Sequence, residues 1–188
     1  DLDEGCYTVQ IIDPCIDADL LTERFTDPNL DSPSDWTVVY NSGYSEVAAG
    51  ELQQLVDGTT NTKMSQAFNI PTGQSLLLML SFETGQIDNA DTSGSLYVLD
   101  GGDYLSLFSV FTLESNKVYS AILLVDSSFF GSGYLDMGFN LDARISITPD
   151  QLNVIKKVSI KTAPSTVSGI YQSNCLQVSS VVEGTRLV

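Results

Sequence analysis

The 188-residue sequence predicts an all-β protein, built as a β-sandwich or a β-barrel. Three observations favour this class. Some short segments alternate apolar and polar residues, other short segments are continuously apolar, and turn-forming residues separate them at near-regular spacing. The chain is long enough to bury a substantial apolar core, so we expect one large domain with short appendages.

The segment YLDMGFNLD at 134–142 has the clearest strand pattern, with a strict period of two. Its apolar residues share one side of an extended chain: Leu135, Met137, Phe139 and Leu141. Segments 75–83 and 118–126 are instead almost continuously apolar and are bounded by turn residues. We expect them to be central strands that are packed on both faces in the middle of the core.

The segment EVAAGELQQLVDG at 46–58 has two interpretations. It is either a helix that ends at Asp57-Gly58 or two strands that flank a tight turn at Gly50. The interior glycine and the β-type neighbours favour two strands. Further strands are expected at 6–12, 36–40, 63–70, 94–100, 104–113, 143–147 and 153–161.

The charge balance limits the partners of this chain. Asp and Glu number 24 against 8 Lys and Arg, which gives a formal net charge of −16. Such a chain repels phosphate backbones and anionic lipid surfaces, so we expect no nucleic-acid partner. We also expect no membrane insertion, because no stretch approaches the ~20 apolar residues that are needed to cross a bilayer.

The chain contains no histidine, which excludes Ser-His-acid and Cys-His catalysis and removes the commonest zinc ligand. Three cysteines, Cys6, Cys15 and Cys175, cannot complete a four-ligand zinc site by themselves. Cys6 and Cys15 either pair across a short loop or are reduced, partly buried thiols, and the second interpretation is favoured. No metal and no cofactor is therefore predicted.

A series of motifs follows in a fixed order along the chain. They are Phe25, the turn-rich DPNLDSPSD, Trp36, GELQQL at 50–55, SQAFNIPTGQSLLLMLSFE at 65–83, SGSLYVLDGGD at 93–103 and VIKKVSIK at 154–161. This order resembles the carbohydrate-binding-module-like (galactose-binding-like) jelly rolls that occur in secreted glycosidases and in virion proteins of tailed bacteriophages.

The resemblance implies a two-sheet antiparallel jelly-roll β-sandwich at residues 23–162, with short N- and C-terminal extensions. Residues 1–22 are then an N-terminal strand or linking segment. Residues 163–188 are a linker and a C-terminal strand that can begin a further module.

In such domains the residue that matches Trp36 is similar to a core tryptophan, so we expect Trp36 to be buried rather than to form a sugar platform. The family often carries a structural calcium ion that uses an Asp just before the last strand. Here Lys156 and Lys157 occupy that position, so no calcium site is expected there. We interpret these lysines as protection of a sheet edge.

Sugar binding in this fold class uses an aromatic face with nearby Asp, Asn or Gln side chains. The candidate carbohydrate-binding residues are loop-borne aromatics: Tyr44, Tyr104, Phe129, Phe130 and Tyr134. The alternative is that these residues close the end of the sandwich or pack on a neighbouring subunit.

The resemblance implies a non-enzymatic structural or adhesive virion protein of a tailed bacteriophage, which forms a homo-oligomer with other virion subunits and is located in the virion. The alternative is a glycan-binding module of a larger secreted or surface protein, which is extracellular and binds a host surface glycan. A glycosidase is the least favoured function. Its carboxylate pairs would be Asp100 with Asp103 or Asp88 with Asp91, and these are ordinary turn residues.

Overall fold

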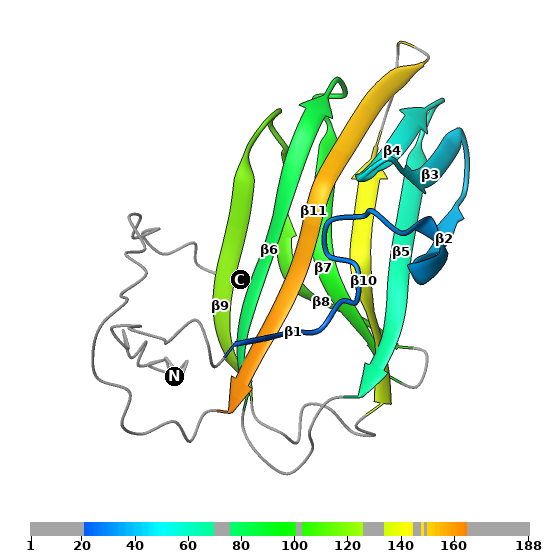
Figure 1. The fold of residues 1–188 in the computed structure, drawn as a ribbon. Helices are drawn as coiled ribbons and strands as arrows, with labels where there is room; N and C mark the ends of the chain where they lie inside the picture. The colour runs from blue at the N-terminus through cyan, green and yellow to red at the C-terminus, as the bar shows by residue number, and fades with distance from the viewer. Residues whose placement is uncertain are drawn as a thin grey trace, which may run out of the picture.

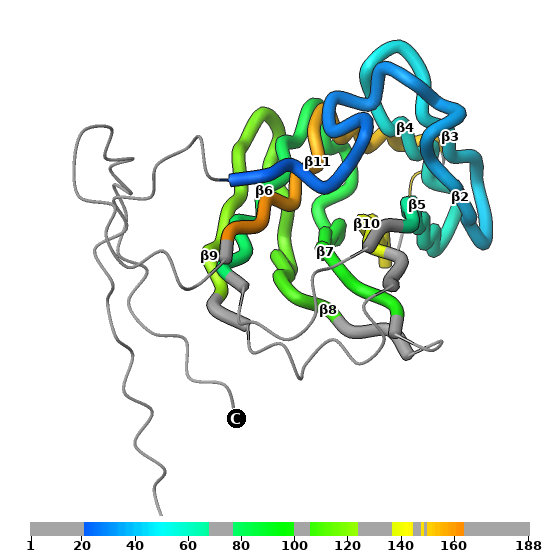
Figure 2. The backbone as a smooth tube through the Cα atoms, turned by 60° about the horizontal axis from the view of Figure 1, so that its bottom comes forward, coloured from blue at the N-terminus to red at the C-terminus, as the bar shows by residue number. Residues whose placement is uncertain are grey.

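The structure, a computed structural model, describes residues 21–69, 76–100, 103–125, 134–144, 148 and 150–164. These residues form two antiparallel β-sheets packed face to face (Figure 1). Figure 2 shows the same two layers from another side, and β2 and β3 lie next to one another where the layers meet at one edge. The predicted all-β fold and its antiparallel jelly-roll sandwich are confirmed.

The first sheet, here called sheet A, contains six strands. In spatial order they are β3 (Tyr44–Ala48), β4 (Glu51–Val56), β11 (Gln151–Pro164), β6 (Leu76–Ile87) and β9 (Val118–Val125), with β1 (Thr22–Glu23) paired to β11. Both β1 and β4 pair with β11, at opposite ends of that long strand.

The second sheet, sheet B, contains five strands. In spatial order they are β2 (Thr37–Tyr40), β5 (Thr60–Asn69), β10 (Tyr134–Ala143), β7 (Thr92–Asp100) and β8 (Asp103–Val110). A short 3-10 turn, η2 (Pro33–Asp35), leads into β2. No helix among the described residues is long and apolar enough to span a bilayer.

The ambiguous segment 46–58 forms the hairpin of β3 and β4, so the two-strand interpretation is confirmed and the helix is wrong. Ala49 and Gly50 form its turn with φ values of 55° and 80°. Positive φ at both central residues is the geometry of the hairpin turns that match the twist of paired strands. The alternate residues Val47 and Leu52 face the core and are buried.

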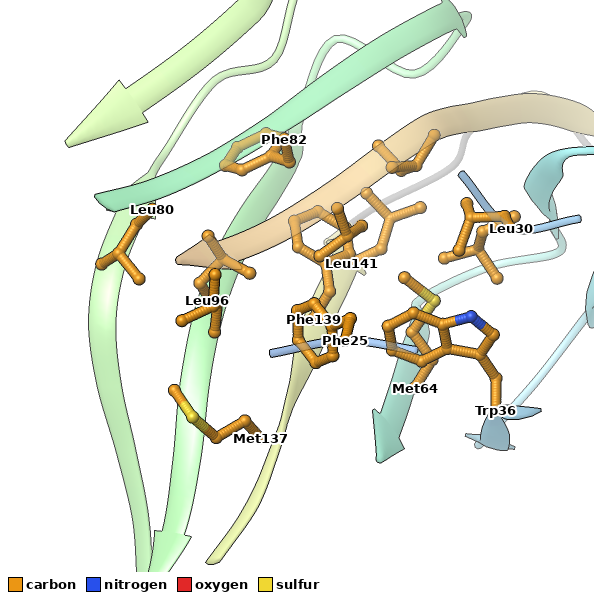
Figure 3. Packing of buried hydrophobic residues seen from close by; sticks show 14 of the residues in the cluster. Phe25, Leu30, Trp36, Met64, Leu80, Phe82, Leu96, Met137, Phe139 and Leu141 are labelled. Carbon is orange, nitrogen blue, oxygen red and sulfur yellow. The ribbon is translucent and has the colours of Figure 1, made fainter. Parts of the chain in front are cut away.

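The core lies between the sheets, where alternate residues of each strand meet (Figure 3). The predicted inward side of 134–142 is confirmed at Met137, Phe139 and Leu141, which are fully buried. Phe82 lies at the centre of an aromatic group whose other rings lie 4.8 to 5.9 Å from it: Phe108, Tyr119 and Phe139.

Trp36 is buried, with 6% of its surface exposed, as the resemblance implied. Its ring lies 4.8 Å from the ring of Phe25. The indole Nε1 donates to the backbone oxygen of Asp27 at 3.1 Å and to its Oδ2 at 3.2 Å. The same carboxylate accepts the backbone N–H groups of Asp31 and Ser32, so this loop and the indole hold one another in place.

A polar layer joins the two sheets at one end of the sandwich. Gln54 Nε2 of sheet A donates to Thr62 Oγ1 at 2.9 Å and to the backbone oxygen of Leu141 at 3.0 Å, both in sheet B. Asn153 Nδ2 donates to Gln54 Oε1 at 3.0 Å and to Thr92 Oγ1 at 3.1 Å. All these side chains are buried, and their mutual hydrogen bonds offset the loss of water.

One prediction about strand position is wrong. Segment 118–126 forms β9, which is an edge strand of sheet A rather than a central one. Lys156 and Lys157 are exposed on β11, where β6 pairs on one side, whereas β4 pairs with β11 only up to Ile155 and β1 pairs only at Lys161 and Thr162. That these lysines protect an edge stays a prediction. They lie where the pairing of β11 with β6 shifts register. An apolar run reports burial and β propensity, whereas the sheet order decides how many neighbours a strand has.

The remaining strand predictions fall partly on residues that are not described. The predicted strand 143–147 is wrong at its start, because Ala143 ends β10 and Arg144 lies outside it. The predicted strand 6–12 and the cysteines lie outside the described residues, as do nearly all of the predicted extensions 1–22 and 163–188. The division into these segments stays a prediction.

Candidate functional site

The outer face of sheet B, the side turned away from sheet A, carries mainly small polar residues. We call this set the polar face. Its described members alternate with core residues along five strands: Thr37, Val39, Asn61, Lys63, Ser65, Ala67, Ser93, Ser95, Tyr97, Ser106, Ser109, Asn140 and Asp142.

Strand pairing arranges the centre of the polar face in rows that cross β5, β10 and β7. One row is Asn61, Asp142 and Ser93, and the next is Lys63, Asn140 and Ser95. Neighbours within a row are separated by the strand spacing of about 4.8 Å, and rows are about 7 Å apart. The face therefore presents polar groups at regular intervals in two directions.

The two asparagines form a side-chain pair across β5 and β10. Asn61 Nδ2 donates to Asn140 Oδ1 at 2.8 Å. This bond fixes both amides and leaves the Asn61 oxygen as an acceptor and the Asn140 nitrogen as a donor for a ligand. Half-buried Asp142 lies opposite Asn61 in the same row. A neighbouring acceptor and donor are the arrangement that a sugar with adjacent hydroxyl groups can match.

Tyr97 occupies an outward position of sheet B, yet it is only 2% exposed, so other atoms cover this part of the polar face. The hydroxyl end of its ring lies against Gly138, since a Cβ atom there would lie 2.7 Å from the tyrosine oxygen and 2.0 Å from the backbone oxygen of Met64. The Tyr97 hydroxyl donates to that same oxygen at 3.3 Å. Tyr97 was not among the predicted site residues. The available signal was the glycine within the alternating strand 134–142, because glycine inside a strand marks a close approach.

Two predicted binding residues lie in strands of sheet B. Tyr104 of β8 pairs with Leu99 and Tyr134 of β10 pairs with Asn69 in the strand register. Their backbones therefore lie near the same end of sheet B. Phe129 and Phe130 lie outside the described residues.

Tyr44 does not join the polar face, because β3 belongs to sheet A. It is 48% exposed, and its ring lies edge-on to Tyr40 with 6.2 Å between centroids. The Tyr44 hydroxyl donates to Glu46 Oε2 at 2.6 Å. This hydrogen bond, with smaller contributions from burial and from the charge of Glu46, raises the pKa of Tyr44 above its ordinary value of 10.0.

Asp88, one of the carboxylates considered for a glycosidase, accepts hydrogen bonds from neighbouring residues. Asp88 Oδ1 accepts a hydrogen bond from Gln86 Nε2 at 2.8 Å, and its Oδ2 accepts one from the backbone N–H of Leu152 at 3.2 Å. Asp100 and Asp103 oppose one another where β7 turns into β8. No group of three or more Cys, Asp or Glu residues in the described part of the chain is arranged to hold a metal ion.

No family model and no curated protein sequence matches this chain. Solved structures do match it. TmCBM61 in complex with β-1,4-galactotriose has a TM-score of 0.52 at 14% identity, and the match covers 74% of this chain and 97% of that chain. A CBM4 structure has a TM-score of 0.51 at 10% identity and covers 75% of this chain and 99% of that chain. The described chain thus has the jelly-roll fold of carbohydrate-binding modules.

Proposed function

We propose that this chain is a glycan-binding module and that the polar face of sheet B holds the glycan. The observation that carries the proposal is the hydrogen-bonded pair of Asn61 and Asn140, with Asp142 opposite Asn61 on the neighbouring strand. Fixed amides and a carboxylate recognise hydroxyl groups with little loss of side-chain freedom on binding. The shared fold with a module that was solved with β-1,4-galactotriose supports the same conclusion.

The proposed ligand is a neutral glycan. A chain with a net charge of −16 repels acidic polysaccharides. Within the face, Asp142 and Lys63 lie in neighbouring rows and carry opposite charges, so the centre of the face has no net charge to attract an ionic ligand. Tyr104 and Tyr134, whose backbones lie near one end of sheet B, are proposed to contact the apolar side of a sugar ring. This division gives hydrogen bonds at the centre of the face and aromatic contact at its end.

The test is a titration by isothermal calorimetry with neutral oligosaccharides, beginning with β-1,4-galactotriose and followed by xylo- and cello-oligosaccharides. Loss of one hydrogen-bonding partner in a buried contact costs about 1–3 kcal/mol, so Asn140→Ala is expected to weaken binding about 5- to 150-fold. Asn29→Ala is the matched control, because Asn29 is exposed and lies in the segment beside sheet A.

Failure of every neutral glycan on an array to bind would overturn the proposal. If a glycan binds the wild-type chain, Asn140→Ala and Tyr104→Ala with equal affinity, the polar face is not its binding site. Unfolding curves of the variants separate loss of binding from loss of structure.

A non-enzymatic, extracellular module is part of this proposal. The virion role stays a prediction.

A further inference from the structure

Among the described residues the strand orders of the two sheets end in four strands, and three of these limit contact with another chain. The two-residue strand β1, which pairs only with β11, lies outside these orders. The edge strands β2 and β3 contain only four and five residues. The pairing of β8 with β7 shifts register between Leu96 and Tyr97, which marks a bulge. Short edges and bulges are the usual protection against unwanted strand pairing.

The fourth edge strand, β9 (Val118–Val125), has none of these features. It contains eight residues and pairs with β6 over its whole length without a register shift. Its sequence VYSAILLV contains no charged residue, no proline and no glycine. On its outer face Val118 is 69% exposed and Ile122 is 37% exposed. A long, straight and apolar edge is a template for another strand.

We propose that β9 pairs with β9 of a second copy of this chain, in antiparallel orientation about a two-fold axis. The pairing joins the two copies of sheet A into one continuous sheet, and no other segment of the described chain has to move. Two-fold pairing is self-complementary, because each copy supplies the same donors, acceptors and side chains.

The strand geometry restricts the register of this dimer. Paired positions must lie on the same face of the sheet. The two-fold axis therefore lies midway between the two β9 strands, level with one residue that faces its own copy, rather than level with a peptide bond between two residues. With the axis at Ile122, the two copies of that exposed side chain lie opposite one another and cover each other. Apolar cross-strand pairs of this kind stabilise antiparallel sheets.

β9 carries no charge that a cationic partner strand could recognise, so an equally uncharged strand, such as β9 of a second copy, is the occupant that fits it. Two chains that each carry −16 repel over most of their surfaces. Because β9 is uncharged throughout, its pairing places no like charges opposite one another. A cationic partner would instead gain most by contacting the acidic surface elsewhere. The dimer is therefore expected to strengthen when salt screens the repulsion, whereas a contact between opposite charges would weaken.

The experiment is analytical ultracentrifugation of the wild-type chain with a reducing agent present, at protein concentrations from about 1 to 500 μM and at low and high salt. The expected result is a species of twice the 20.3 kDa chain mass whose fraction rises with concentration and with salt. Ile122→Lys places a charge on the two-fold axis and is expected to give a monomer.

Val39→Lys is the matched control, since Val39 is 62% exposed on the edge strand β2, and it is expected to leave the dimer intact. A monomer under all conditions overturns the proposal, including the case in which another part of the same chain covers β9. A dimer that weakens with salt, or that Ile122→Lys leaves unchanged, overturns it as well. Both lysines replace exposed side chains, and thermal unfolding of each variant checks that the fold is kept.

Discussion

Two aromatic pairs lie close together in the sequence but in opposite surroundings. Phe25 and Trp36 are 3% and 6% exposed and pack between the sheets, whereas Tyr40 and Tyr44 are 42% and 48% exposed at the edge where β2 and β3 meet. Both pairs make a ring–ring contact. Their difference teaches that an aromatic residue next to a turn does not by itself indicate a binding site, because the sheets decide which rings reach solvent.

Tyr97 is intermediate between the two pairs. It occupies an outward position on sheet B, yet it is at least as well buried as Trp36, and the hydroxyl end of its ring lies against Gly138. It therefore offers no exposed stacking surface. Three changes test this ranking, from the buried pair through Tyr97 to the exposed pair.

Trp36→Ala should have the largest effect. It removes a buried ring and the two hydrogen bonds to Asp27, and such truncations cost about 3–5 kcal/mol of unfolding free energy. Urea denaturation followed by circular dichroism measures this loss. The matched change Tyr40→Ala is expected to cost less than about 1 kcal/mol. Similar losses in the two variants would contradict the contrast between the pairs.

Tyr97→Phe should have an intermediate effect. It keeps the ring over Gly138 but removes the hydroxyl that donates to the backbone oxygen of Met64. The expected cost is about 0.5–1.5 kcal/mol of unfolding free energy, measured in the same way. Tyr119→Phe is a useful comparison, because the Tyr119 hydroxyl accepts from the exposed backbone N–H of Glu114, where water can replace it. A larger loss for Tyr119→Phe than for Tyr97→Phe would show that the hydrogen bond from Tyr97 to Met64 stabilises the fold less than we infer.

Glu46→Gln should have the smallest effect and should concern only the exposed pair. The pKa of Tyr44 is raised chiefly by its hydrogen bond to Glu46, so the variant is expected to ionise one tyrosine at lower pH. Difference absorbance of the phenolate against the wild-type chain measures this change. A raised pKa favours the folded state below the unfolded pKa, and this contribution is lost as pH rises through the folded pKa, at alkaline pH above about 10. Superimposable titrations would mean that the bond is absent in solution.

The fold was predictable because its signals are local. Alternation at 134–142 placed Met137, Phe139 and Leu141 in the core, and the glycine at position 50 placed the turn of the β3–β4 hairpin. The burial of Trp36 was predicted from the resemblance. The position of β9 at an edge was not predictable, because its apolar run is equally compatible with a central strand.

The predicted binding residues stay a prediction. Tyr104 and Tyr134 were chosen as loop aromatics, and their backbones lie in β8 and β10 of sheet B. Asn61 and Asn140 were not chosen, because they are 79 positions apart and each is an ordinary polar residue of an alternating strand. Their pairing depends on the register between β5 and β10, which no local pattern specifies.

The sequence by itself determined the β class, the turns, the absence of histidine chemistry and the acidic character, since each depends on residue types and short-range spacing. Tertiary structure alone decided which polar residues share a face, that Tyr97 is buried at an outward position and that β9 lies at an edge. The physical reason is that strand order and register come from contacts between segments far apart in the chain. Those contacts are specified by the packing of the whole core rather than by any one segment.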